Sequence, residues 1–125
     1  MIKKIIVLLV LICSANLASA QDAQQQKIDS VCQLVKKYWN EKNPDKIYAM
    51  AGDEFRQQLS LENFKKVYSE KLVFLGEMKE TVFESYSNGV NKYKAVFPST
   101  DLSFFLSLDK NNKIGTFLFK PYSEQ

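Results

Sequence analysis

The chain has 125 residues, with 17 Lys or Arg, 14 Asp or Glu and no His. This length suits a single domain, and its charges are scattered, so no basic patch indicates binding to nucleic acid. The lack of histidine removes the commonest general base and the commonest metal ligand, which argues against catalysis by histidine and against a zinc or copper site.

Residues 1–20 have the pattern of a signal peptide. Two lysines precede the apolar run Ile5–Cys13, and the small residues of Ala18–Ala20 offer a cleavage site before Gln21. The run is shorter than the roughly 20 apolar residues of a membrane-spanning helix. We therefore expect export to the periplasm or the outside of the cell, cleavage after Ala20, and no membrane insertion of the mature chain.

The two cysteines predict neither a lipid anchor nor a disulfide. Cys13 is the one candidate for lipidation, but it lies inside the apolar run and follows Ile12, where a small residue is expected. Cleavage then leaves Cys32 alone, which excludes an intramolecular disulfide. The mature domain must rely on its core, and nine Phe, six Tyr and one Trp can supply it.

Three helices are expected in the first half of the mature chain, after a polar, frayed leader at 21–27. The first has an apolar stripe at helical spacing, made of Ile28, Val31, Cys32, Val35 and Trp39. A short second helix is expected to start at Pro44, with Asn43 as its cap, and to stop at Gly52. A third follows Ser60 with the stripe Leu61, Phe64, Val67, Tyr68 and Leu72.

After Gly76 the apolar period changes from 3.6 to 2, which predicts strands. Strands over 77–86 and 90–97 are joined by Asn88–Gly89, a strong hairpin signal. A second hairpin joins 101–108 to 114–120. Helices first and strands last predict one α+β domain over 28–122, in which three helices pack on a four-stranded antiparallel sheet.

Several segments resemble a bacterial family of exported domains of unknown function, often found before serine hydrolase domains. The resemblance is carried by Asn43–Met50, Phe55–Leu59, Leu61–Tyr68 and Leu108–Pro121. It covers nearly all of the mature chain and implies the cone-shaped α+β fold of the nuclear-transport-factor-2-like superfamily. The family has no established catalytic residues or cofactor to transfer. The candidate residues for lining such a cone are Tyr48, Phe55, Tyr68 and Phe104.

The nucleophile candidates have simpler interpretations. Cys32 lacks a partner base and lies on an apolar stripe, so a buried, inert thiol is the better interpretation. Ser107 and Lys110 match the Ser-x-x-Lys pattern of penicillin-recognising enzymes. That pattern requires the start of a helix, whereas Ser107 ends a strand, so we regard the match as chance.

The carboxylate candidates are weighed in the same way. Asp53 and Glu54 could present a carboxylate to a pocket beneath the sheet, but charges at the N-terminus of a short helix beginning near Phe55 explain them more simply. Glu84 and Tyr86 on the first strand could also act as an acid or base in a pocket, but a structural role on the strand explains them more simply.

The final hairpin offers a candidate interaction face. If Leu108 pairs with Ile114, then Phe105 lies opposite Phe117 with Phe119 beside it, on the sheet face away from the helices. Three neighbouring phenylalanines are too apolar for an ordinary solvated face. Either the sheet simply buries them, or they bind a partner protein or a second copy of the chain.

Together these patterns predict a non-catalytic exported domain without a cofactor. It would bind an unknown protein partner, a second copy as a homodimer, or a small apolar ligand. The alternative is a small enzyme that uses a pocket carboxylate and a tyrosine for proton transfer or hydrolysis. An ionisable group with a raised pKa in a concave pocket would favour the enzyme, and a filled apolar cone would favour the binding or structural role.

Overall fold

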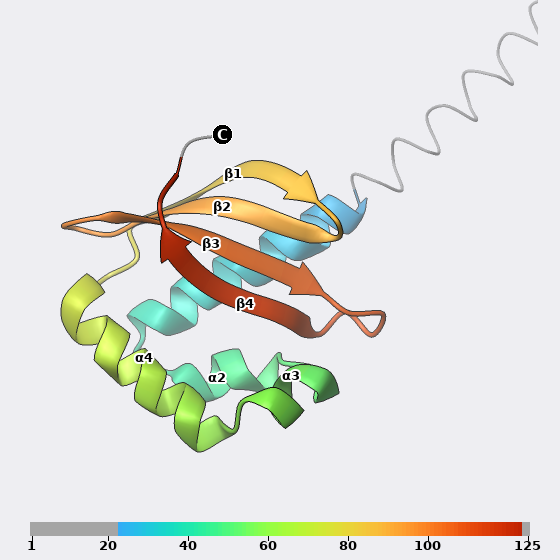
Figure 1. The fold of residues 1–125 in the computed structure, drawn as a ribbon, viewed down its shortest axis with the longest axis horizontal. Helices are drawn as coiled ribbons and strands as arrows, with labels where there is room; N and C mark the ends of the chain where they lie inside the picture. Colours follow the sequence, from blue (N-terminus) through green and yellow to red (C-terminus); the bar gives the residue numbers. More distant parts are fainter. Residues whose placement is uncertain (1–22, 124–125) are drawn as a thin grey trace, which may run out of the picture.

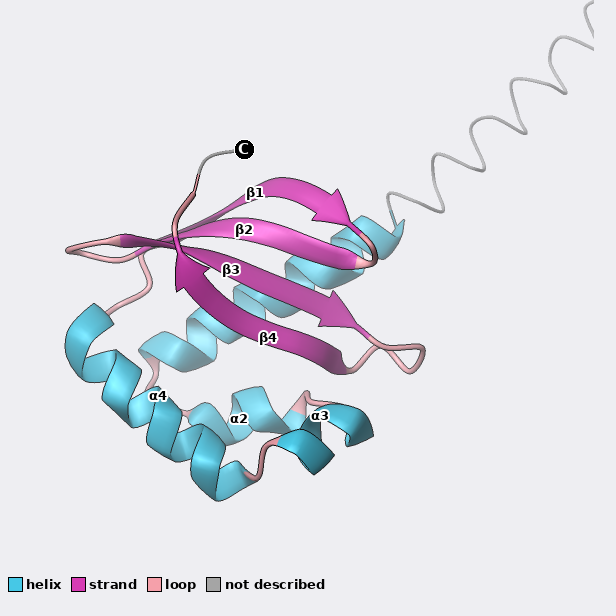
Figure 2. Ribbon diagram, in the orientation of Figure 1, coloured by secondary structure: helices cyan, strands magenta, loops and turns pink. Residues whose placement is uncertain are grey.

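The computed structural model describes residues 23–123, which form an α+β domain (Figure 1, Figure 2). Its helices are residues 23–40, α2 (Pro44–Ala49), α3 (Asp53–Gln58) and α4 (Leu61–Leu75). Its strands are β1 (Glu80–Ser87), β2 (Val90–Val96), β3 (Asp101–Leu108) and β4 (Ile114–Pro121). They form one antiparallel sheet in the order β1-β2-β3-β4, which confirms the predicted fold class. The predicted signal peptide, including Cys13 and the cleavage site after Ala20, lies outside the described residues.

The first helix lies across one face of the sheet (Figure 1). Its predicted stripe is buried, with Ile28, Cys32, Val35 and Trp39 at most 3% exposed. The expected frayed leader is helical in its described part, since residues 23–27 already belong to this helix. Gln, Ala and Lys are good helix formers, and Gln25 Nε2 donates to Asp29 Oδ1 one turn later, at 3.0 Å.

The prediction of three helices was wrong, because α3 is a fourth helical segment of the described chain. Gly52 does not end α2 as a stop residue. It is extended (φ −85°) and forms the N-cap of α3. Asp53 and Glu54 follow in the first turn, where negative charge stabilises the helix N-terminus. A Cβ at Gly52 would collide with the Asp109 carboxylate, so a larger residue there would require the Asp109 side chain to move.

The other helix boundaries follow the predicted signals. α2 has Pro44 at its first turn and Asn43 at the cap position, although the Asn43 side chain makes no capping hydrogen bond. α4 is capped by Ser60, whose hydroxyl accepts from the Asn63 backbone N–H at 3.2 Å. It ends at Gly76, which takes the positive φ of 71° that helix-terminating glycines favour.

Aromatic side chains fill the space between the helices and the sheet. The Trp39 ring meets Tyr68 edge-on at 4.8 Å between centroids, and it also contacts Phe97 and Phe119. Phe104 is fully buried and stacks on Phe119 at 4.7 Å. These contacts place the core between the first helix, α4 and strands β3 and β4.

Hydrogen bonds fasten the end of the first helix to the segment that enters β1. Trp39 Nε1 donates to the Gly76 carbonyl at 2.9 Å. The Asn40 side chain donates to the Met78 carbonyl at 2.9 Å and accepts from the Met78 N–H at 2.8 Å. The tryptophan therefore both fills the core and satisfies a carbonyl at the end of α4.

Candidate binding site on the outer face of the sheet

The two faces of the sheet have different roles. One face contacts the helices: Thr81 on β1 accepts from Gln33, and Tyr93 on β2 donates to Asp29 at 2.7 Å. We call the opposite face the outer face. The strand register aligns four of its side chains in one row across the whole sheet: Ser85, Lys92, Phe105 and Leu118.

The predicted face of three phenylalanines was wrong, because Phe117 and Phe119 point to the core. Leu108 does pair with Ile114, as expected, but the next pair is Ser107 with Thr116, so Gly115 forms an irregularity in β4. From there on every β4 residue is shifted by one place, and a shift of one reverses its face. Phe104 consequently pairs with Phe119 and Leu106 with Phe117, and both pairs join the core. Phe105 is the one predicted residue left on the outer face, where it pairs with Leu118.

A pocket of about 460 Å³ lies on the outer face, and we call it the outer pocket. Its lining residues are Ser85, Ser87, Asn88, Val90, Lys92, Phe105, Thr116, Leu118, Lys120 and Ser123. Val90, Phe105 and Leu118 contribute the large apolar side chains. Among the described lining residues, two lysines are the charged ones and none is a carboxylate. The volume falls within the range of about 300–1,000 Å³ that is usual for small-molecule sites.

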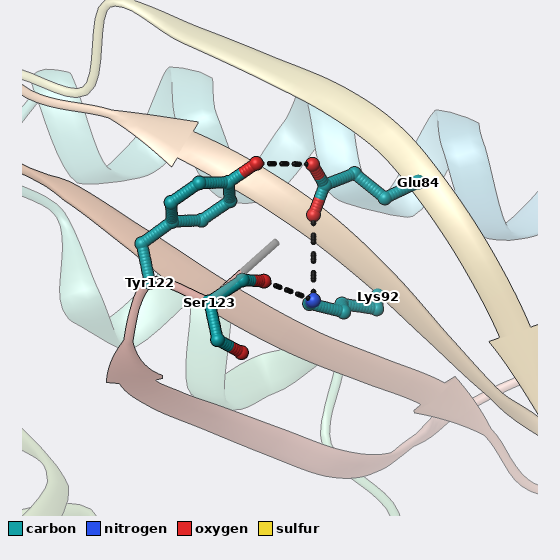
Figure 3. Close-up of polar contacts among 4 residues, drawn as sticks. All are labelled: Glu84, Lys92, Tyr122 and Ser123. Atoms are coloured by element: carbon teal, nitrogen blue, oxygen red, sulfur yellow. Dashed lines mark hydrogen bonds and ion pairs between the residues drawn. The ribbon is translucent and has the colours of Figure 1, made fainter. Parts of the chain in front are cut away.

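The segment after β4 passes over the outer face (Figure 1), and its residue Ser123 lines the pocket. After β4, Tyr122 reaches across the sheet to β1, and its hydroxyl donates to Glu84 Oε2 at 2.6 Å (Figure 3). Lys92 Nζ donates to the Ser123 carbonyl oxygen at 2.7 Å and lies 3.6 Å from Glu84 Oε1. Lys92 is only 9% exposed, so a charged side chain is buried on a face that would otherwise be solvated.

Neighbouring outer-face residues extend this polar group. Lys94 pairs with Asp101 at 3.6 Å, and its ammonium lies 5.1 Å from the centre of the Tyr122 ring. Lys120 Nζ lies 5.5 Å from the centre of the Phe105 ring, which is within the usual range for a cation–π contact. Ser103 stands between the two lysines in the register. It is 1% exposed, and its hydroxyl has no hydrogen-bond partner among residues 23–123.

Three comparisons, with protein-family models, with curated proteins and with solved structures, were made for this chain. None of them finds a match. Within residues 23–123, no helix is both long and apolar enough to cross a membrane. The same residues contain no cluster of three or more potential metal-binding side chains. The site must therefore be judged by its own geometry.

The predicted cone-lining residues pack together in the aromatic core. Phe104 and Tyr68 are buried, and Tyr48 and Phe55 are partly buried against them. The Tyr68 hydroxyl donates to the Trp39 carbonyl at 2.6 Å, and the Tyr48 hydroxyl donates to the Leu59 carbonyl at 2.8 Å. Burial also raises the pKa of Tyr68. Both phenols thus serve as structural donors to backbone carbonyls.

Cys32 is a buried thiol, as the sequence predicted. It has no exposure, and desolvation by burial raises its pKa to about 11, although a hydrogen bond with Thr81 acts in the opposite direction. Burial likewise raises the pKa of Tyr93, which donates to Asp29 and accepts from Asn91. A raised pKa keeps a thiol or phenol protonated at neutral pH, and a protonated thiol is a poor nucleophile.

A second, smaller pocket of about 270 Å³ lies where α3 meets the last hairpin. Asp53 lines it together with Arg56 and Asp109. Arg56 donates from its guanidinium to the carbonyls of Tyr48, Ala49 and Ala51, so it caps the end of α2. Asp109 accepts from the backbone N–H groups of Asn111 and Lys113, so it organises the hairpin loop. The charged groups of Arg56 and Asp109 are therefore already used to hold the fold.

The remaining catalytic candidates do not form a common site. Ser107 lies in β3 and Lys110 in the loop after it, as expected for a chance match to the Ser-x-x-Lys pattern. Glu84 lies at a register shift of β1 and reaches Lys92 and Tyr122. Tyr86, by contrast, is 62% exposed. Sequence reasoning did not connect Glu84 with Tyr122, because the two residues are 38 positions apart.

Proposed function

We propose that this protein is a non-catalytic binding domain whose binding surface is the outer face of the sheet. The observation that carries the proposal is the outer pocket, in which Phe105 and Leu118 form an apolar centre between lysines and small polar side chains. Leu118 ends the row of side chains across the sheet, on the edge strand β4, and its apolar side chain is 45% exposed. A recess of this kind suits a small ligand better than a flat protein partner.

We also propose that the domain is exported and has a nuclear-transport-factor-2-like cone. The predicted signal peptide supports export, and a single antiparallel sheet that follows its covering helices supports the cone. Aromatic rings occupy the space between helices and sheet, including all four residues considered as a cone lining. This packing supports a binding site on the outer face instead of one inside the cone.

The enzyme alternative has one feature in its favour, the hydrogen-bonded pair of Glu84 and Tyr122. Neither of them lines the outer pocket, whereas their neighbours Lys92 and Ser123 do. The Glu84 carboxylate forms an ion pair with Lys92 and accepts a hydrogen bond from the Tyr122 hydroxyl. This pairing supports a structural role in holding the chain end on the sheet, and we favour binding over proton transfer.

Amide chemical shifts provide the test. A panel of small apolar and amphiphilic compounds is titrated into the isotope-labelled mature protein, and the shifted residues are mapped. We expect the largest shifts at Val90, Phe105 and Leu118. Shifts that gather instead around the exposed Val73 and Phe74 of α4, or that are scattered, would contradict the proposal.

Self-association is measured alongside by sedimentation. If the wild type forms a dimer that Leu118→Glu dissociates, the outer face binds a second copy and the small-ligand form of the proposal fails. A matched Val73→Glu variant on α4 controls for the added negative charge, because Val73 is 83% exposed and lies on a helix instead of the sheet.

A further inference from the structure

The outer pocket has a cationic end, an apolar centre and an end lined mainly by small polar side chains. Register places Lys120 one row from the Phe105–Leu118 pair, on the side where Tyr122 and Ser123 cross the sheet. On the other side, Val90 and Thr116 line the pocket next to the β1–β2 turn. A ligand that follows the pocket therefore meets two lysines at one end and Phe105 and Leu118 in the middle. At the other end it meets Val90 among hydroxyl and amide side chains.

The two lysines differ in how their charges are paired, since Lys92 has Glu84 as an ion-pair partner and Lys120 has none among residues 23–123. The Lys120 ammonium stays above the Phe105 ring. Lys92 faces Glu84 at 3.6 Å, a distance beyond a normal hydrogen bond, and donates to one carbonyl oxygen. An ammonium has three N–H donors. Within residues 23–123 Lys92 uses one of them in a hydrogen bond to Ser123, so it can still donate to a ligand.

We propose that the outer pocket binds a small single-chain carboxylate. The carboxylate would accept from Lys92 and Lys120, and the chain would lie on Phe105, Leu118 and Val90. This assignment rests on the proposed function, since it names the ligand of the same surface. Hydrogen bonds to charged groups are the strong ones in such sites, and they strengthen where water is excluded.

The composition of the pocket separates this ligand from its competitors. An alkylammonium would meet two lysines, and the described lining residues offer it no carboxylate. A neutral alcohol of the same chain length would gain the apolar contacts but not the charge-assisted hydrogen bonds. A lipid vesicle presents many anionic head groups on a broad surface, whereas this pocket is a recess bounded on one side by Ser123.

The experiment compares octanoate, 1-octanol and octylammonium, which have one chain length and three head groups. Binding to the mature protein is followed by amide shifts and by calorimetry. We expect octanoate to bind about tenfold more tightly than octanol, because one charge-assisted hydrogen bond is worth that factor. Octylammonium is expected to bind more weakly than octanol. The octanoate preference should shrink as salt is added.

Two variants divide the contributions. Lys120→Gln keeps a polar side chain but removes its charge, so octanoate should lose most of its preference over octanol while the affinity for octanol is unchanged. Leu118→Ser removes apolar contact, so both ligands should weaken by about tenfold. Leu118 is partly exposed, so the fold should survive the change. Val73→Ser on α4 is the matched control and should leave both affinities unchanged.

Each other outcome has a definite meaning. Equal affinities for the three probes would overturn the carboxylate assignment while leaving the outer face as a binding surface. Tighter binding of octylammonium would show that the negative charge of Glu84 outweighs the two lysines, and it would also overturn the carboxylate assignment. Shifts at Val90, Phe105 and Leu118 with phosphatidylglycerol vesicles but not with octanoate would identify a membrane surface instead. If no probe shifts these residues, both the assignment and the proposed function fail.

Discussion

Replacing Trp39 tests how the helices are attached to the sheet. Trp39 is 2% exposed, contacts three aromatic rings and donates a hydrogen bond to the Gly76 carbonyl. Trp39→Ala should reduce the free energy of unfolding by about 3–5 kcal/mol, the usual cost of such a core truncation. Trp39→Phe keeps a ring but removes the N–H donor, so the lost hydrogen bond should cost roughly 0.5–1.5 kcal/mol, with a smaller packing term added.

Urea unfolding followed by far-UV circular dichroism measures both changes, because the variants lack the only tryptophan fluorophore. A loss of 1 kcal/mol lowers the melting temperature by about 4–8 °C for a domain of this size. Phe74→Ala is the matched control: Phe74 is 82% exposed, and its removal should change stability by less than about 0.5 kcal/mol. If Trp39→Ala costs no more than Phe74→Ala, the core assignment is refuted. If Trp39→Phe costs as much as Trp39→Ala, the ring packing contributes little and the hydrogen bond dominates.

Three further predictions concern the ends, the thiol and the chain crossing. The mature protein should begin at Gln21, and mass spectrometry of exported material that finds an intact N-terminus or a lipid on Cys13 would contradict this. Burial raises the pKa of Cys32 from 9.0 to about 11, so the folded state retains its thiol proton longer than the unfolded state. The free energy of unfolding should therefore fall as pH rises from 9 towards 11, by up to about 1.4 kcal/mol per pH unit, and Cys32→Ala should remove this part of the fall. Tyr122→Phe removes the donor to Glu84 and should increase amide exchange at the chain end without altering the exchange of core amides; a global increase would show that the crossing stabilises the whole fold.

Local signals predicted the elements well because their causes are local. The Trp39 stripe, the Ser60 cap and the Asn88–Gly89 turn depend on neighbouring residues. In that turn both residues take positive φ, 52° and 83°, as a tight hairpin turn requires. α3 was suggested only as a short helix near Phe55 that would explain Asp53 and Glu54. It was not counted among the three helices, because six residues are too few for a clear apolar period.

The candidate site could not be predicted in the same way. The error in the phenylalanine face came from Gly115, whose irregularity reverses every later side chain of β4. An isolated glycine inside a strand is a known sign of such an irregularity, so this signal was present in the sequence. The crossing of Tyr122 to Glu84 had no such signal, since it joins the last described residues to the first strand. The burial of Lys92 depends on that crossing.

The register shift at Glu84 also affects how the protein behaves at high concentration. β1 and β4 are the two edges of the sheet, and β4 is partly occupied by a bridge from Ala51 to Ile114. β1 has no such bridge among the described residues, and it exposes Val82 and Phe83. A regular strand of this composition would be a template for edge-to-edge aggregation, and an irregularity with an acidic residue at its centre disrupts that template. Deleting Glu84 would straighten the edge, and we expect the shortened protein to form fibrils where the full chain stays dispersed.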